Sequence, residues 1–272
     1  MRRIQSASSI NMYKQCPRKY YYRYIQKLPD EPNIHAIRGS IVHEALEHFF
    51  KMPVTGITNY KVELPRKLEQ LFDLFWIQNK AKLQQLKLTI EELNHYYSDS
   101  RMMLSSWMRK FLKKLDDTIT FQEAFEKLRP DVEEEFVSQK RGVRGFVDAI
   151  YHTENGLEVI DYKTSRKDIV TPEYSLQAGI YALLIGEIKG EYPKNICFDF
   201  LKGETRPVPV DEVLLKQTKF EIENMHASTD SEDARDYPRK PSGLCKWSNE
   251  RGSGQCPFYD VCKPRNPELW ED

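Results

Sequence analysis

The chain has 272 residues, of which 40% are hydrophobic and 30% are charged, and this composition is typical of a soluble globular protein. No apolar run approaches the roughly 20 residues of a membrane-spanning helix, and no apolar stretch follows the basic residues at the start. We therefore expect a cytoplasmic protein with neither a secretory signal nor a membrane partner. Because 41 Lys and Arg residues balance 41 Asp and Glu residues, bulk charge gives no indication of a nucleic-acid partner, and any such contact must come from a local patch.

The first half of the chain predicts helices. Serines suited to capping begin the first segment, and Pro17 divides it into two short helices. Another helix is predicted after Gly39, and on it His43 and Glu47 share one face because they are four residues apart. Residues 61–129 keep helical periodicity throughout. They predict a helical insertion.

Beyond Pro130 the pattern changes to that of an α/β sheet. Short β-prone runs cover residues 132–139, 143–152, 157–163 and 195–203. Glu154-Asn155-Gly156 predicts a hairpin turn between the second and third runs. A helix is predicted between the third and fourth runs, with Thr171 as its N-cap and Pro172 at its first position. Strand, helix and strand in succession predict a crossover unit.

Three charged residues stand inside the β-prone runs. Alternation places Asp161 and Lys163 on the same face of their strand, and pairing across the hairpin brings Asp148 to the same end of the sheet. Two carboxylates that meet there repel each other unless a cation lies between them, and magnesium is commonly held by one or two carboxylates. A surface salt bridge is the simpler interpretation of D-x-K alone, but the surrounding strands and hairpin favour a site of metal-assisted phosphodiester hydrolysis.

Four motifs occur in series along the chain: GSIVHEALE, RGFVDAI, VIDYKTS and LQAGIYALL. The series resembles the PD-(D/E)XK nuclease superfamily, and specifically its RecB-type exonuclease branch, which includes the CRISPR-associated exonucleases. The resemblance implies a restriction-endonuclease-like α/β core, with a short mixed sheet flanked by helices. The implied core covers residues 31–60 and 130–226, with the helical insertion at 61–129 and a connector at 227–240.

The resemblance also implies an activity. The protein would be a metal-dependent DNA nuclease that uses Mg²⁺ or Mn²⁺, and an exonuclease acting on single-stranded DNA or on DNA ends. Repair, recombination and CRISPR adaptation would be its settings, with other repair or CRISPR proteins as partners. Two alternatives stay open: a non-hydrolytic DNA-binding or assembly subunit that keeps the nuclease fold, and a hydrolase directed at RNA.

Roles for individual residues follow from the same resemblance. The implied metal ligands are His43, Asp148, Asp161 and the backbone carbonyl of Tyr162. The implied catalytic residues are Lys163, Asp148, Asp161, Gln177 and Tyr181.

Gln177 and Tyr181 match a Q-x-x-x-Y motif, whose spacing places both on one helix face. Glu134 or Glu135 would be an acidic residue of the preceding strand, and the run of three glutamates leaves its identity open. Without the series, His43 would be interpreted as a core histidine, and Gln177 and Tyr181 as helix-surface residues.

Four of the five cysteines suggest a second site. Cys197 lies among strand residues and is interpreted as packing, whereas Cys16 near the start and Cys245, Cys256 and Cys262 near the end are enough for one metal site. These thiolates would hold either a 4Fe-4S cluster or a tetrahedral zinc and would join the two ends of the chain. The RecB-type branch has this layout around a 4Fe-4S cluster. The resemblance therefore implies an iron-sulfur lobe made of residues 1–30 and 241–272.

Basic and aromatic residues alternate around Cys16. Arg18, Lys19 and Arg23 are interleaved with four tyrosines between residues 20 and 24. This mixture would grip phosphates and stack on unpaired bases, or the tyrosines would pack inside the lobe while the basic groups are solvated. Both interpretations stay open from the sequence.

Overall fold

The computed structural model describes residues 3–29, 33–86, 88–245 and 256–262. Its contacts divide the chain into two compact units. The terminal unit contains Met1–Glu31, Gln139–Val143 and Lys216–Asp272, and the sheet unit contains Pro32–Ser138 and Arg144–Leu215. The terminal unit thus unites segments from both ends of the chain, although parts of the expected iron-sulfur lobe (1–2, 30, 246–255 and 263–272) lie outside the described residues.

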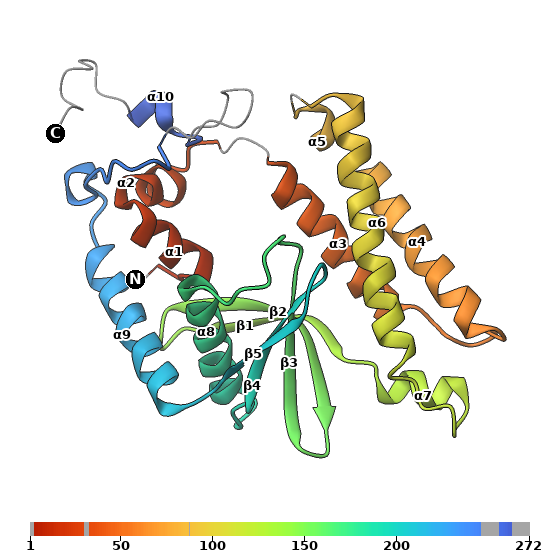
Figure 1. Ribbon diagram of the computed structural model, residues 1–272. Helices are drawn as coiled ribbons and strands as arrows, with labels where there is room; N and C mark the ends of the chain where they lie inside the picture. The colour runs from red at the N-terminus through yellow and green to blue at the C-terminus, as the bar shows by residue number, and fades with distance from the viewer. Residues whose placement is uncertain (1–2, 30–32, 87, 246–255, 263–272) are drawn as a thin grey trace. The chain divides into compact units, whose positions relative to one another are not determined.

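A five-stranded mixed sheet is the centre of the sheet unit (Figure 1). Its strands, which neighbour one another in chain order, are β1 (Asp131–Ser138), β2 (Val143–Thr153), β3 (Gly156–Lys163), β4 (Asn195–Phe200) and β5 (Thr205–Pro209). β3 pairs antiparallel with β2 and parallel with β4, and the crossover between β3 and β4 is α8 (Pro172–Ile188). The α/β architecture, the hairpin and the crossover unit predicted from the sequence are therefore confirmed.

β5 is a strand that the sequence did not predict. It carries Pro207 and Pro209, which cannot donate to a ladder, and it pairs antiparallel with β4. It is the last strand in the order β1 to β5, and prolines are tolerated on such edge strands because one side needs no hydrogen-bond partner.

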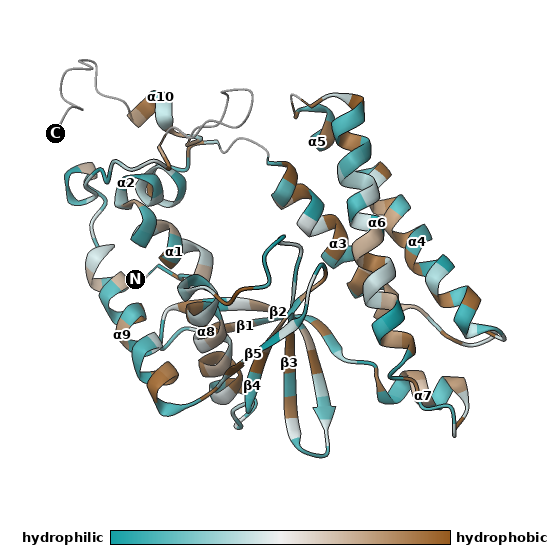
Figure 2. Cartoon of the chain, viewed as in Figure 1, coloured by the Kyte–Doolittle hydropathy of each residue, from teal (hydrophilic) through white to brown (hydrophobic). Residues whose placement is uncertain are grey.

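The register of β3 separates its apolar residues from its charged ones. Ala149 of β2 lies opposite Ile160 of β3. Ile160 and Tyr162 belong to a buried core that they share with the helical segment, whereas Asp161 and Lys163 project from the other face toward α8. Brown and teal residues accordingly alternate along the strands in Figure 2. The strand alternation predicted for Asp161 and Lys163 is confirmed.

Helices cover the face of the sheet that carries Ile160 and Tyr162. They are α3 (Ile34–Lys51), α4 (Tyr60–Gln78), α5 (Lys80–Gln84), α6 (Ile90–Leu112) and α7 (Phe121–Lys127). Most of residues 61–129 thus lies in α4 to α7, in agreement with the helical periodicity of this segment. Phe49, Phe50, Trp107, Phe111 and Phe125 contact one another through ring centroids 5.3–6.4 Å apart, which fixes α3, α6 and α7 together and places α3 beside the ends of the strands.

The terminal unit packs around tyrosines. Its helices are α1 (Ala7–Gln15), α2 (Pro17–Tyr20), η1 (Tyr21–Ile25), most of α9 (Glu212–Ser228), η2 (Ala234–Asp236) and α10 (Tyr259–Cys262). Tyr237 lies in the stretch expected to be a connector, but its side chain is fully buried and stacks on Tyr20 with ring centroids 6.0 Å apart. Arg18 holds the same stretch by donating from Nε to the Tyr237 carbonyl at 2.7 Å. Part of the expected connector is therefore packed within this unit.

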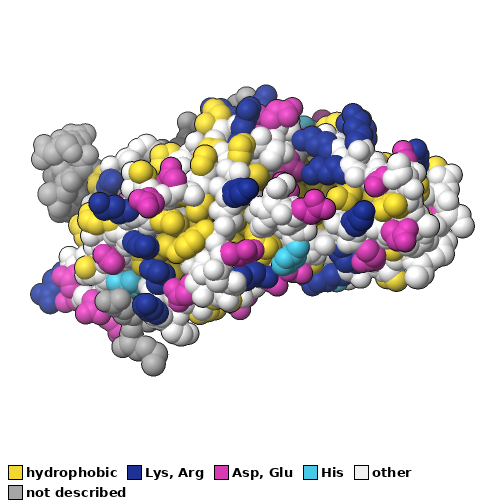
Figure 3. All heavy atoms as spheres, turned by 90° about the horizontal axis from the view of Figure 1, so that it is seen from below, with side chains coloured by type: hydrophobic (Ala, Val, Ile, Leu, Met, Phe, Trp, Pro, Cys, Tyr) yellow, Lys and Arg dark blue, Asp and Glu magenta, His cyan; other side chains and the backbone are white. Residues whose placement is uncertain are grey.

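The described helices include none that is both long and apolar enough to cross a membrane. Lys and Arg side chains are interspersed with Asp and Glu on the face shown in Figure 3. This mixture agrees with a formal net charge of zero. A site that binds charged ligands would therefore lie in a local hollow and not on a broad surface of one charge.

Candidate active site and cysteine cluster

Asp148 and Asp161 meet at the open end of the β2–β3 pairing, away from its turn. Both are largely buried, with 9% and 2% of their surface exposed. Asp148 is held by the backbone N–H of Tyr162, which donates to its Oδ2 at 2.7 Å. Both carboxylates line a hollow of about 600 Å³ that opens between α3, the strand ends and α8. The hairpin thus brings together the two carboxylates that the sequence paired.

The two oxygens of Asp161 have different partners. Its Oδ1 accepts hydrogen bonds from Gln177 Nε2 at 2.9 Å and from the Tyr181 hydroxyl at 3.2 Å. Its Oδ2 lies 2.6 Å from Lys163 Nζ but is a buried atom without a well-formed hydrogen bond. Burial raises the pKa of Asp161, and the nearby Asp148 carboxylate raises it further, whereas Lys163 lowers it. A carboxylate in this position is stabilised by additional positive charge.

Lys163 is held in place by three partners. Its Nζ donates to Gln177 Oε1 at 2.9 Å, pairs with Asp161, and lies 4.8 Å from the centre of the Tyr174 ring. Gln177 also donates to the Tyr181 hydroxyl at 2.7 Å. The two α8 residues that match the Q-x-x-x-Y motif therefore form one hydrogen-bonded network with Asp161 and Lys163. Because this network fixes its rotamer, Lys163 presents its ammonium group to the hollow at a defined position.

His43 approaches the carboxylates from α3. Its Nδ1 lies 3.2 Å from Asp148 Oδ1. Burial alone would lower the pKa of His43, but Asp148, with smaller contributions from Asp161 and Glu133, raises it to about 9. Ligand atoms of His43, Glu133 and Asp148 all lie within 4.8 Å of one another. This grouping of one imidazole and two carboxylates is a candidate metal centre.

Glu133 is the member of the run of three glutamates that lines the hollow. Glu134 or Glu135 was expected here, but Glu134 pairs with Lys189 at 3.0 Å and Glu135 lies 3.8 Å from Arg144. The backbone of Glu133 has a φ of 52°, a left-handed conformation that is rare for a non-glycine residue and is concentrated at functional sites. Burial, followed by the Asp148 carboxylate, raises the pKa of Glu133 to about 7. Three successive glutamates gave no signal to separate them, because the distinction lies in this local backbone conformation.

The donor set of the hollow fits a hard divalent cation. Asp148, Asp161 and Glu133 supply oxygen atoms, and His43 supplies one nitrogen. Oxygen ligands suit Mg²⁺ and Mn²⁺, and Mn²⁺ also accepts imidazole. Tyr162 lies between the carboxylates, and its ring packs on the opposite face of β3 against Trp107, with ring centroids 6.2 Å apart. Asp161 Oδ2 already pairs with the Lys163 ammonium group, so these three carboxylates share one lysine and one histidine, and a divalent cation would balance the remaining negative charge.

Gly145 sets the distance between β2 and α8. A Cβ atom at this position would lie 2.9 Å from Tyr181 Cε1 and 3.3 Å from Leu184 Cδ1. We expect Gly145→Ala to lower the free energy of unfolding by about 1–3 kcal/mol through overpacking, and to lower Tm by several degrees. Gly39→Ala is the control, because its Cβ would meet only Thr164 Oγ1 at an ordinary 3.6 Å and alanine favours the helix. Equal Tm values for the two variants in thermal unfolding would contradict the prediction.

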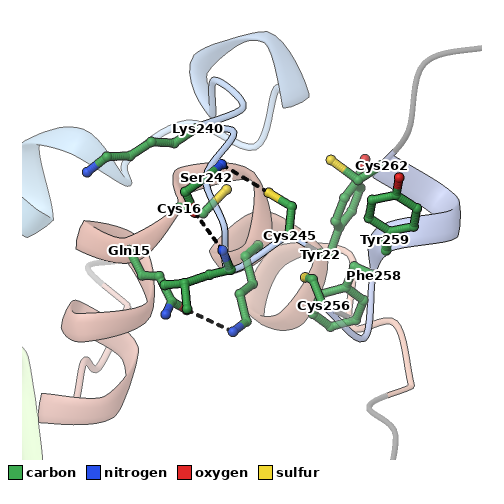
Figure 4. A pocket seen from close by; sticks show the side chains of 12 residues that line it. Gln15, Cys16, Tyr22, Lys240, Ser242, Cys245, Cys256, Phe258, Tyr259 and Cys262 are labelled. Atoms are coloured by element: carbon green, nitrogen blue, oxygen red, sulfur yellow. Dashed lines mark hydrogen bonds between the residues drawn. The ribbon is translucent and has the colours of Figure 1, made fainter. Parts of the chain in front are cut away.

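The four cysteines outside the sheet line a single pocket in the terminal unit (Figure 4). Cys16 comes from the turn between α1 and α2, and Cys245, Cys256 and Cys262 come from the C-terminal segment. The Cys256 backbone N–H donates to the Cys245 carbonyl at 2.9 Å, so these two residues approach despite the ten residues between them. Burial raises the pKa of the Cys256 and Cys262 thiols, and neighbouring cysteines raise it further. The raised pKa values favour the neutral thiols, and among the described residues the sulfur atoms do not form a ready-made metal site like that of His43, Glu133 and Asp148.

The remaining cysteine and the N-terminal tyrosines have packing roles. Cys197 is buried in β4, and burial raises the pKa of its thiol to about 11. Tyr20 and Tyr22 are buried, Tyr20 contacting Gln5 and Tyr22 contacting Phe258 beside the cysteine pocket. The sequence left open whether the tyrosines of this segment stack on bases or pack inside the protein. Tyr20 and Tyr22 pack inside the protein.

Comparisons with known proteins agree with this geometry. The family model for the PD-(D/E)XK nuclease superfamily matches residues 5–263. None of the curated proteins matches the chain. A solved structure from Eubacterium rectale, named "Putative exonuclease", superposes with a TM-score of 0.56 at 13% identity over 98% of this chain and 93% of that one. At 13% identity the structural likeness shows only a shared fold. The match to the family model, which spans nearly the whole sequence, shows the family. The chain belongs to the PD-(D/E)XK nuclease superfamily.

Proposed function

We propose that this protein is a deoxyribonuclease that hydrolyses phosphodiester bonds with Mg²⁺ or Mn²⁺. The observation that carries the proposal is the convergence of His43, Glu133, Asp148 and Asp161 on one hollow beside the fixed ammonium group of Lys163. A divalent cation bound there would supply Lewis-acid chemistry, polarising a phosphate oxygen and lowering the pKa of a bound water. A nucleic acid would present phosphodiester oxygens to such a site, and membership of the PD-(D/E)XK nuclease superfamily supports DNA as that partner.

The protein's own residues have separate roles in this proposal. Asp148 and Asp161 would hold the cation, together with His43, Glu133 and the backbone carbonyl of Tyr162. Lys163 stabilises the negative charge that develops on the scissile phosphate, which is strongest when the donor is fixed in advance. Gln177 and Tyr181 are positioning residues, since both donate to Asp161 and Gln177 also accepts from Lys163.

A binding measurement separates this enzyme from a non-hydrolytic subunit that keeps the fold. We expect Mn²⁺ to bind the wild-type protein in calorimetric titration, and Asp148→Ala to abolish that binding together with DNA cleavage. Asp168→Ala is the matched control, because Asp168 pairs with Arg206 outside the hollow. Mn²⁺ binding that is unchanged in Asp148→Ala would contradict the proposed site.

Glu133→Gln tests the ligand that the structure adds to the site. The amide keeps the size and shape of the carboxylate but removes its charge, so we expect the Mn²⁺ concentration for half-maximal cleavage to rise about 10- to 100-fold. Glu134→Gln and Glu135→Gln are the controls, because their carboxylates pair with Lys189 and Arg144 instead. If Glu134→Gln or Glu135→Gln shifted the metal requirement more than Glu133→Gln, the assignment of Glu133 would be wrong.

We further propose that the protein belongs to the RecB-type exonuclease branch and carries a 4Fe-4S cluster. Cys16, Cys245, Cys256 and Cys262 line one pocket and would hold it, joining both ends of the chain in the terminal unit. Four thiolates without histidine suit either an iron-sulfur cluster or zinc, and the layout of one N-terminal and three C-terminal cysteines favours iron-sulfur. The cluster would supply structural support, because it closes a long loop of the chain.

The proposed substrate is single-stranded DNA or a DNA end, in repair, recombination or CRISPR adaptation, with proteins of those processes as further partners. The name of the Eubacterium rectale structure supports the exonuclease proposal. End-labelled DNA and RNA strands of the same sequence distinguish the two substrate classes. We expect the DNA strand to be degraded and the RNA strand to stay intact, and preferential loss of the RNA strand would overturn the assignment to DNA.

A further inference from the structure

A second hollow, of about 830 Å³, adjoins the metal site within the sheet unit. It shares His43 and Lys163 with the hollow that contains the carboxylates. The rest of its lining comes from the start of α3, from α6 of the helical segment, from the residues after β3 and α8's first turn, and from Lys202 after β4. A strand whose scissile phosphate lies at the metal site would therefore continue into this second hollow.

The two hollows have opposite charge. The first is lined by the acidic side chains of Glu44, Glu47, Glu133, Asp148 and Asp161. The second is lined by the cations Arg38, Lys163, Arg166 and Lys202, and we call it the basic hollow. Its acidic lining residue, Asp99, is already paired with Arg38 at 2.6 Å and with Lys202 at 2.5 Å. The acidic hollow is suited to binding cations. The basic hollow is suited to binding the phosphates of a nucleic-acid strand next to those cations.

An aromatic ring is held at the wall of the basic hollow. Tyr96 of α6 is partly exposed, and the imidazoles of His35 and His95 contact it edge-on with ring centroids 5.6 and 5.7 Å away. The guanidinium carbon of Arg38 lies 5.4 Å from the centre of the same ring. Arg38 is 5% exposed, and its Nε is a buried donor without a hydrogen-bond partner in the described structure. Two imidazoles and the Arg38 guanidinium thus fix the orientation of an aromatic ring at the wall of the hollow.

We propose that the basic hollow binds a nucleotide of a single strand, adjacent to the scissile phosphate, with its base against Tyr96. Arg166 and Lys202 contact its backbone. The inference rests on the proposed nuclease function and adds the residues that select the substrate class. A space of 830 Å³ lies within the range of sites that enclose one small molecule, and an unpaired base can lay its face on Tyr96 whereas a base stacked in a duplex cannot. The helical segment, which supplies Tyr96, would then be the part of the chain that confers preference for single strands.

Binding in the absence of divalent metal tests the inference independently of cleavage. The probe is a fluorescently labelled single-stranded oligonucleotide, and its Kd is measured by anisotropy for wild type, Tyr96→Ala, Tyr96→Phe and Tyr96→Leu. We expect Tyr96→Ala to weaken binding about 5- to 150-fold, the effect of one stacked base. Tyr96→Phe should restore wild-type affinity, because it keeps the ring, whereas Tyr96→Leu should not. Met102→Ala is the matched control, since Met102 is 64% exposed on the same helix and lines neither hollow.

Two comparisons complete the test. A blunt duplex should bind more weakly than the single strand, and Tyr96→Ala should not change its Kd. With metal present, Tyr96→Ala should raise KM for the single strand by a similar factor and leave kcat nearly unchanged, as expected for a residue that contributes uniform binding. Arg166→Ala should reduce the salt dependence of single-strand binding.

The possible failures are distinguishable. Wild type that cleaves neither DNA nor RNA contradicts the proposed function, while the Kd values still decide the inference about the basic hollow. A Tyr96→Ala variant with the Kd of Met102→Ala overturns the inference even if wild type is an active nuclease. Equal effects of Tyr96→Leu and Tyr96→Phe would also overturn it, because they would show that the side chain acts through its bulk and not by stacking.

Discussion

Lys163→Ala is expected to lower the rate of DNA cleavage by about 10²- to 10³-fold while metal binding persists. The lysine is held by Gln177 Oε1, by Asp161 and by the Tyr174 ring, so its charge is fixed beside the proposed phosphate position before a substrate binds. The variant should keep its metal ligands, since Asp148, Glu133 and His43 are unchanged. The added Mn²⁺ should therefore raise the Tm of Lys163→Ala at least as much as that of wild type.

Asp161→Asn supplies the contrasting result. It removes a proposed metal ligand, so both DNA cleavage and the metal-induced rise in Tm should be lost. Lys167→Ala is the control for the general effect of removing a cation, because Lys167 is exposed four residues further along the chain. If the cleavage rate of Lys163→Ala were within about threefold of the rate of Lys167→Ala, the proposed catalytic role of Lys163 would be wrong. If Asp161→Asn kept its metal-induced shift in Tm, Asp161 would not be a ligand.

Cys16→Ser is the second substitution with a large expected effect. It removes the single N-terminal thiol of the cysteine pocket, so the protein purified without oxygen should lose its iron, its sulfide and the visible absorbance of the cluster. The terminal unit should unfold at a lower temperature, since the link between the two ends of the chain is broken. Cys197→Ser is the matched control, because Cys197 lies in β4 and outside that pocket.

The metal content decides between the alternatives for this site. Iron and sulfide at wild-type levels in Cys16→Ser would contradict the four-cysteine assignment. A colourless wild-type protein that contains zinc would replace the iron-sulfur proposal with a structural zinc site. Loss of iron in Cys197→Ser but not in Cys16→Ser would show that the pocket is not where the metal binds.

Local patterns predicted much of the sheet unit. The two-residue period of β3 separated Asp161 and Lys163 from Tyr162, and the short hairpin brought Asp148 within reach of the same strand end. The four-residue spacing of Gln177 and Tyr181 placed both on one face of α8. These features depend on periodicity and short loops, which residues close in sequence already determine.

Other features depend on backbone conformation or on contacts between distant segments. Glu133 has a left-handed φ at the site. A run of three glutamates does not predict which of them adopts this backbone conformation. β5 was missed because its prolines are typical of turns, and only its edge position makes them acceptable. The helical periodicity around Tyr96 predicted α6, but the hollow that this tyrosine lines forms only when α6 meets α3 and the residues after β3. The burial of Tyr237 likewise depends on contacts with tyrosines more than 200 residues earlier in the chain.

The most direct test of the central claim is the cleavage of end-labelled single-stranded DNA by anaerobically purified protein. Wild type, Asp161→Asn and Lys167→Ala would be compared with Mn²⁺, with Mg²⁺ and with a chelator. We predict that wild type and Lys167→Ala degrade the strand only when metal is present, and that Asp161→Asn leaves it intact. Cleavage that persists in the chelator or in Asp161→Asn would contradict a nuclease site built from these carboxylates, as would an intact strand in every wild-type sample.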